Sequence, residues 1–206
     1  VKNFIFLGSS CVYPRLCKQP IKEAYLLSGA LEKTNDAYAI AKIAGIKMCE
    51  EYRNSYNVNY FSLMPSNLYG TNDSYNEKNS HFIPALIRKA YECKKKNLNK
   101  IIIWGSGKPK REVMFVDDLA DACIFFLKKK PEHSLINIGT GIDRSIIFYA
   151  KTICKIFEIN PKFIFDKSKP DGTPKKCMNV NLAKSYGWHS KTSLRKGLEI
   201  SINDFI

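Results

Sequence analysis

Short apolar runs alternate with helical patterns along almost the whole chain, and this alternation restricts the fold more than any other feature. The apolar runs have the length of buried strands and lie at 4–7, 60–64, 101–104, 135–138 and 162–165. Helical patterns are predicted over 38–52, 83–91, 117–127 and 146–157, and from about residue 193 onward. Asp117 and Asp118 are expected to cap the third of these helices. Strands that alternate with helices predict an α/β fold, with a parallel sheet covered on its faces.

The net charge of +14 favours an anionic partner. The lysine clusters, however, occupy 94–96 and 128–130, each at the end of a predicted helix, where cations complement the helix dipole. No nucleic-acid-binding motif accompanies them. We therefore expect solvated helix ends and an anionic small substrate, and no nucleic acid as a partner.

The seven cysteines are odd in number and form no CxxC pair, which argues against a disulfide framework and against a zinc site. No apolar run is long enough to cross a bilayer, and no signal segment opens the chain. We expect a cytoplasmic protein with reduced thiols, no metal and no membrane partner.

Tyr38 and Lys42 are four residues apart in a predicted helix, so their side chains lie on one face, one turn apart. A lysine ammonium beside a phenol favours the phenolate, which lets the tyrosine act as an acid or base. The spacing alone is weak, because such pairs occur by chance on many helices.

Ser9 and Ser10 strengthen this interpretation because they follow the first predicted strand, and ligands of open α/β sheets bind beyond the carboxyl ends of the strands. A serine hydroxyl there can hold a substrate carbonyl oxygen beside the tyrosine. The alternative is a serine turn that only ends the strand. Along an extended segment, Ser9 and Cys11 would point the same way.

Taken together, Ser9, Tyr38 and Lys42 resemble the Ser-Tyr-Lys group of the extended short-chain dehydrogenases. The surrounding segments are similar to the GDP-L-fucose synthase family in particular, over essentially the whole chain. Those segments are 8–14 (GSSCVYP), 65–70 (PSNLYG), 79–81 (NSH), 84–89 (PALIRK) and 168–174 (SKPDGTP).

The resemblance implies 3,5-epimerisation of GDP-4-keto-6-deoxy-D-mannose and NADPH-dependent reduction of its 4-ketone, with NADP as the cofactor and a GDP-sugar as the substrate. Tyr38 would donate the proton in the reduction. Cys11 would be the base of the epimerisation and His81 the acid, a pairing that suits proton removal next to a carbonyl. The alternatives are a buried, packing Cys11 and a capping or core His81.

Further site residues follow from the resemblance alone. The NADP site would be lined by Leu7, Gly8, Ser9, Ser10, Lys42, Pro65, Ser66, Asn67, Leu68 and His81. The GDP-sugar would contact Lys89, Trp104, Arg111 and Asp171. Arg111 suits a diphosphate because its fork pairs bidentately. Lys89 stands where the family commonly has arginine, and Arg88 beside it would share its role.

The main departure from the family is the missing glycine-rich dinucleotide loop, since Gly105-Ser106-Gly107 and Gly139-Thr140-Gly141 lack the required spacing. We expect about three βα units of roughly 30 residues each to be missing before residue 1. The 206 residues alone are accordingly expected to be inactive.

The expected fold class is the C-terminal part of a Rossmann-type doubly wound parallel sheet plus a smaller α/β substrate-binding domain. Residues 1–70 would be the rest of the dinucleotide-binding domain. Residues 71–206 would be mainly substrate-binding, with 101–140 partly returning to the Rossmann sheet.

The family resemblance also implies a homodimer through the helix that carries Tyr38. Ile40, Ile43, Ala44 and Met48 would serve either that interface or the core. Two other functions stay open. One is another NAD(P)-dependent nucleotide-sugar epimerase or reductase, and the other is a non-catalytic binding module.

Overall fold

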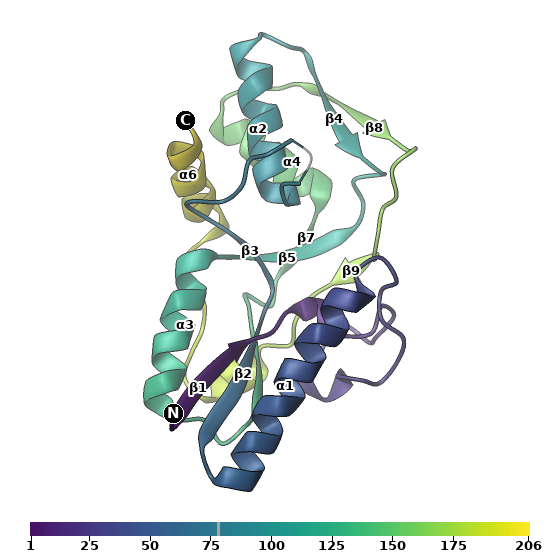
Figure 1. Cartoon of the computed structure of the whole chain (residues 1–206). Helices are drawn as coiled ribbons and strands as arrows, with labels where there is room; N and C mark the ends of the chain where they lie inside the picture. The colour runs from purple at the N-terminus through teal and green to yellow at the C-terminus, as the bar shows by residue number, and fades with distance from the viewer. Residues whose placement is uncertain (78) are drawn as a thin grey trace. The chain divides into compact units, whose positions relative to one another are not determined.

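The computed structural model describes residues 1–77 and 79–206, and the chain divides into two compact units (Figure 1). The first unit comprises residues 1–68, 112–142 and 176–191. The second comprises residues 69–111, 143–175 and 192–206. Each unit is therefore assembled from segments far apart in the sequence.

The first unit contains a parallel sheet in the order β1-β2-β6. Its strands are β1 (Asn3–Leu7), β2 (Asn59–Pro65) and β6 (Leu135–Ile138). Leu7 pairs with Leu63, and Pro65 pairs with Ile138. The predicted α/β fold with a parallel, Rossmann-type sheet is confirmed.

Helices α1 (Asp36–Tyr56) and α3 (Val116–Lys129) cover opposite faces of this sheet. Along β2, Phe61 and Leu63 pack with α3 in one core, whereas Met64 packs with α1 in another. Successive strand residues point to opposite faces, so β2 contributes to both cores. The unit also contains the 3₁₀ helices η1 (Ser10–Val12) and η2 (Glu23–Tyr25) and the short helix α5 (Asn181–Ser185).

The second unit packs α2 (Phe82–Lys95), α4 (Ile146–Ile156) and α6 (Leu194–Phe205) together. Strands β4 (Lys100–Trp104) and β8 (Lys162–Asp166) form a parallel pair beside α2. The buried residues of α2 and α4 follow the predicted helical spacing.

Short strands lie where the chain passes from one unit to the other. They are β3 (Asn67–Tyr69), β5 (Lys110–Phe115), β7 (Asp143–Ser145) and β9 (Lys175–Lys176). Strands β3, β5 and β7 are neighbours in that order, and β9 pairs with β5. The sequence patterns did not predict these strands, because such short segments lack a clear apolar period.

Two local predictions are wrong. Asp117 and Asp118 do not cap α3: the capping position is Phe115, and both aspartates lie in the first helical turn, where their charge complements the dipole. The segment after Ser9 is not extended, because residues 10–12 form η1. Within the described ranges, no helix combines the length and the apolar character needed to cross a membrane.

Candidate active site

Ser9 lies at the carboxyl end of β1 and caps η1. Its Oγ accepts a hydrogen bond from the Cys11 amide at 3.2 Å, so the serine does form the turn that was one of the two interpretations. A hydroxyl that accepts one bond still has its own hydrogen to donate, so the catalytic interpretation remains compatible with this turn. The preceding residue is Gly8, and a Cβ there would overlap the end of the Met64 side chain, which would have to shift.

Lys42 connects α1 to the same strand end. Its Nζ donates to the Leu7 carbonyl oxygen at 2.8 Å and lies 5.8 Å from the centroid of the Tyr38 ring. Tyr38 itself is half-exposed, at 48%. The i, i+4 pair therefore lies on one face of α1 as predicted, and the lysine fixes that face against the strand that leads to Ser9.

Residues 65–68 continue from β2 into β3 beside this strand end. Because β1 and β2 are parallel neighbours, both predicted cofactor segments leave the same edge of the sheet. The Ser66 amide donates to the Ile138 carbonyl oxygen at 2.9 Å, and Asn67 Nδ2 donates to the Glu112 carbonyl oxygen at 3.0 Å. The structure thus brings residues 7–10 and 65–68, which belong to different segments, to one edge.

Cys11 has a partner that the sequence did not indicate. Lys176 Nζ lies 3.4 Å from Cys11 Sγ, and both residues are half-buried in the first unit. Cys11 is consequently not a fully buried packing residue, which was the alternative for it.

A buried polar network behind the strand ends also went unpredicted. Asn137 at the end of β6 is fully buried, and its Oδ1 accepts from the Tyr13 hydroxyl at 2.7 Å. Its Nδ2 donates to the carbonyl oxygens of Ile21 at 3.0 Å and Asn179 at 3.3 Å. Burial, and secondarily the charge of Glu23, raises the pKa of Tyr13, so its hydroxyl stays protonated and able to donate.

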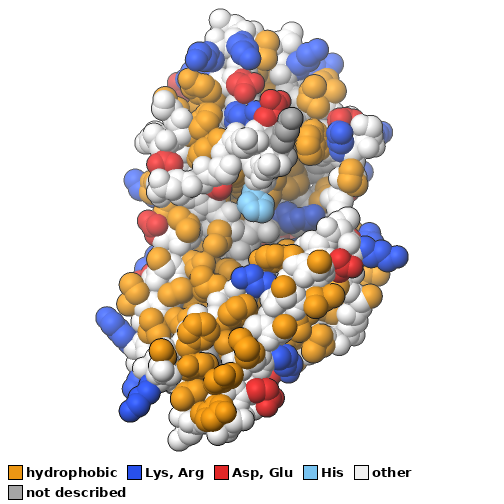
Figure 2. All heavy atoms as spheres, in the orientation of Figure 1, with side chains coloured by type: hydrophobic (Ala, Val, Ile, Leu, Met, Phe, Trp, Pro, Cys, Tyr) orange, Lys and Arg blue, Asp and Glu red, His pale blue; other side chains and the backbone are white. Residues whose placement is uncertain are grey.

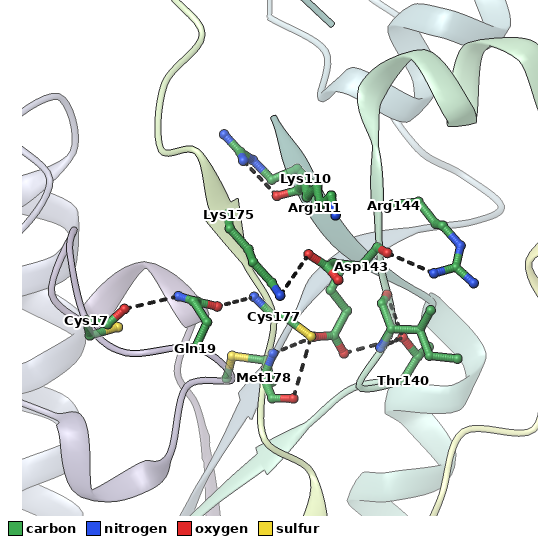
Figure 3. Close-up of polar contacts among 12 residues, drawn as sticks. Cys17, Gln19, Lys110, Arg111, Thr140, Asp143, Arg144, Lys175, Cys177 and Met178 are labelled. Atoms are coloured by element: carbon green, nitrogen blue, oxygen red, sulfur yellow. Dashed lines mark hydrogen bonds and ion pairs between the residues drawn. The ribbon is translucent and has the colours of Figure 1, made fainter. Parts of the chain in front are cut away.

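Glu112 on β5 anchors the neighbouring loops in the same way. It is buried, and its carboxylate accepts from the amides of Gly141 at 2.8 Å and Met178 at 2.6 Å, contacts drawn in Figure 3. Burial raises the pKa of Glu112, and the bonds from these amides offset part of that effect. A side chain at position 139 would overlap the carboxylate, which explains Gly139.

In the second unit, His81 occupies the position before α2. Its imidazole is exposed and does not cap the helix, so neither the capping nor the core interpretation describes it. Its backbone carbonyl oxygen accepts from the Ala85 amide at 3.0 Å, which fixes the residue at the helix start.

Lys89 and Trp104 form a cationic aromatic cluster together with Lys169. The Nζ atoms of Lys89 and Lys169 lie 5.5 Å and 5.4 Å from the Trp104 ring, which is 59% exposed. Lys89 also donates to the Ile102 carbonyl oxygen at 2.8 Å, and burial lowers its pKa. Arg88, which was expected to share the role of Lys89, pairs with Glu77 and Glu92.

Arg111 and Asp171 hold the loop that follows β8. Arg111 Nη1 donates to the carbonyl oxygens of Thr173 at 2.5 Å and Lys110 at 2.9 Å. The Asp171 carboxylate accepts from the Ser106 amide at 2.7 Å and from the Ser106 hydroxyl at 2.8 Å, and these bonds lower the pKa of Asp171. Ser106 follows Trp104 by two residues, so these predicted substrate residues belong to one part of the second unit.

Comparison with known proteins decides the family. A family described as "NAD dependent epimerase/dehydratase family" matches residues 1–139. The chain belongs to this family. The match includes the candidate catalytic residues and ends before Asp171 and Lys176.

Several proteins with named activities are similar to the chain over its whole length. The GDP-L-fucose synthase of Sinorhizobium fredii is 49% identical over 206 residues, which are 100% of this chain and 66% of that protein. A crystal structure of a GDP-6-OMe-4-keto-L-xylo-heptose reductase from C. jejuni is similar with a TM-score of 0.92 and 33% identity, over 100% of this chain and 70% of that one. A GDP-mannoheptose C4 reductase from Campylobacter jejuni with NADP bound has a TM-score of 0.89 and 32% identity, over the same shares. The chain thus spans just under two thirds of the first relative.

Proposed function

We propose that the natural protein carrying this chain is a GDP-L-fucose synthase, which epimerises C3 and C5 of GDP-4-keto-6-deoxy-D-mannose and reduces the C4 ketone with NADPH. One observation carries the proposal. In a chain 49% identical to a GDP-L-fucose synthase, a Lys42 ammonium joins the Tyr38 helix to the strand end that bears Ser9 and Cys11.

The residues of the first unit suit NADP as the cofactor. Ser66 Oγ is buried without a hydrogen-bond partner among the described residues, as expected of a site that a ligand completes. By the family resemblance, Leu7, Gly8, Ser9, Ser10 and Lys42 would hold the cofactor together with residues 65–68 and His81. When bound, NADPH supplies the hydride for the reduction.

Tyr38 performs the acid step of this mechanism, and Lys42 and Ser9 support it. The tyrosine gives its phenolic proton to the O4 oxygen of the substrate, and the Lys42 ammonium stabilises the phenolate that remains. The Ser9 hydroxyl donates a hydrogen bond to the same oxygen and so orients the carbonyl.

Epimerisation uses a separate pair of groups. Cys11 removes the proton from the carbon next to the carbonyl, and the pair of electrons from that C–H bond forms an enolate whose charge rests on O4. His81 returns a proton to the opposite face of the same carbon. The alternatives that the sequence left open for both residues receive no support from their half-buried and exposed positions.

The second unit would recognise the GDP moiety. Lys89 and Trp104 combine positive charge with an exposed aromatic face, and Arg111 adds a guanidinium. Such groups suit a diphosphate and a base. Asp171 would accept a hydrogen bond from a sugar hydroxyl or from the guanine.

A homodimer through α1 is also part of the proposal. Ile40, Ala44 and Met48 are exposed and follow each other every four residues, whereas Ile43 faces the core. Figure 2 shows hydrophobic side chains gathered over α1 and β1. Sedimentation equilibrium of the natural protein should give twice the mass of one chain, and a monomer at micromolar concentration contradicts this part.

A GDP-sugar C4 reductase without epimerase activity is the second candidate. The two structural neighbours described above are named as reductases, and this favours it. Release of C3 and C5 protons to solvent distinguishes the two, because a simple reductase does not exchange them.

The test compares Tyr38→Phe with the parent in the natural protein. The parent should form GDP-L-fucose from GDP-4-keto-6-deoxy-D-mannose and NADPH. Tyr38→Phe should lower turnover by roughly 10²-fold or more because the acid is lost. Tyr52→Phe, on the same helix, is the matched control. Near-parental turnover of Tyr38→Phe removes this residue from the mechanism.

A further inference from the structure

Lys176 contacts Cys11 although 165 residues separate them in the sequence. The ammonium Nζ lies 3.4 Å from Sγ, within hydrogen-bond distance for sulfur. Lys176 belongs to β9 and Cys11 to η1, and both residues are part of the first unit. The fold therefore places a positive charge next to the Cys11 thiol, which we assign as the base of the epimerisation.

The backbone that carries Lys176 is held firmly. The Cys177 amide donates to Gln19 Oε1 at 2.9 Å (Figure 3). The Cys177 carbonyl oxygen accepts from the Ile21 amide at 2.8 Å. One residue further, the Met178 amide donates to Glu112 Oε2. Two segments, residues 19–21 and β5, thus fix the backbone directly after Lys176, so the ammonium is carried by a backbone held by hydrogen bonds.

The two lysines of β9 differ in their partners. Lys175 Nζ pairs with Asp143 at 3.7 Å, whereas Lys176 contacts the thiol. Successive side chains in an extended segment point to opposite sides, which accounts for the difference. Lys175 is therefore a matched control for Lys176, with the same charge and the adjacent position.

Other thiols of the chain have a different environment. Burial raises the pKa of the thiols of Cys17, Cys49, Cys93, Cys123 and Cys154. For Cys17, the charge of Lys176 opposes burial, after a backbone hydrogen bond. These thiols are expected to be unreactive at neutral pH, and all of them except Cys17 provide internal references for a measurement on Cys11.

We propose that Lys176 stabilises Cys11 as the thiolate and so makes it competent to remove the substrate proton. The catalytic part of this inference rests on the proposed function. In the step itself, the sulfur electron pair takes the proton from C3 or C5, the C–H pair enters the enolate, and the enolate charge rests on O4. Lys176 does not itself exchange a proton with the sugar. It is a positioning residue, because it supplies a positive charge beside the sulfur.

The first experiment measures thiol reactivity and needs no substrate. Iodoacetamide at pH 7 and peptide mapping give the alkylation rate of each cysteine in the natural protein. Lys176→Met should slow alkylation of Cys11 by about 10-fold, because the thiolate is the reacting species and loses its cation. Lys176→Arg should restore the rate, and Lys175→Met should leave it unchanged. An unchanged Cys11 rate in Lys176→Met, or an equal loss in Lys175→Met, overturns the proposal.

The second experiment connects the pair to catalysis. With the keto-sugar in deuterated water, Lys176→Met should exchange the C3 and C5 protons about 10-fold more slowly than the parent and Lys176→Arg, in proportion to the lost thiolate. Hydride transfer to an already epimerised ketone should be preserved, and thermal unfolding should match the parent. Parental exchange in Lys176→Met overturns the proposed role. If the parent itself exchanges nothing, the proposed function fails, while the alkylation result still decides whether Lys176 activates the thiol.

Discussion

The two units hold their candidate functional groups in different ways. In the first unit, Lys42 is bonded to a strand end, and Asn137 and Glu112 fix the loops around it from buried positions. In the second unit, Trp104 is exposed, and Asp171 is held by hydrogen bonds at the surface. Under the proposed function, the first unit would fix the reacting atoms, and the second would attract and orient a charged ligand.

This difference predicts separate consequences for stability and for binding. Buried polar groups that lose their partners cost far more free energy than exposed ones, because water cannot replace the missing bonds. Changes in the buried network of the first unit should therefore lower the free energy of unfolding. Changes among the cations of the second unit should weaken substrate binding and leave the fold intact.

The largest effect is expected for Asn137→Leu. The substitution keeps a similar volume but leaves the Tyr13 hydroxyl and the carbonyl oxygens of Ile21 and Asn179 without this partner. The free energy of unfolding should fall by about 2–5 kcal/mol, measured by urea denaturation. Asn99→Leu is the control, because the same change at an exposed position should have little effect. Equal stabilities of the two variants would show that the buried network does not support the first unit.

Asn137 also illustrates what the sequence could and could not predict. The strand over 135–138 follows from its apolar run, and the observed strand is β6 (Leu135–Ile138). The role of its asparagine depends on Ile21 and Asn179, more than 40 residues away on either side, and no local pattern reveals such partners. The contact between Lys176 and Cys11 could not be predicted for the same reason.

Tyr38 and Lys42 could be found because their relation is local. Helical geometry alone places residues four apart on one face, and the structure keeps this arrangement. Glu112 is an intermediate case. It stands in a charged segment that resembles a loop, and the only available signal was the apolar run Val113-Met114-Phe115 that follows it and continues β5.

A smaller effect is expected for Arg111→Lys in the second unit. A lysine keeps the charge but loses the planar fork, so the KM for the GDP-sugar should rise roughly 10-fold with little change in kcat. Arg195→Lys, at an exposed i, i+4 pair with Glu199, is the control and should leave KM unchanged. Steady-state kinetics gives the KM and kcat of each variant, and urea denaturation gives its free energy of unfolding. A loss of stability as large as that of Asn137→Leu would break the contrast between the units.

Exchange of the C3 and C5 protons with deuterated water, followed by mass spectrometry of the sugar, tests the central claim most directly. The parent should incorporate deuterium at both carbons before reduction. Cys11→Ser should largely abolish this exchange and still allow hydride transfer to an already epimerised ketone, because only the base is lost. His81→Gln should form less GDP-L-fucose while exchange persists. If Cys11→Ser exchanges deuterium at the parental rate, the cysteine is not the base, and the epimerase half of the proposed function is contradicted.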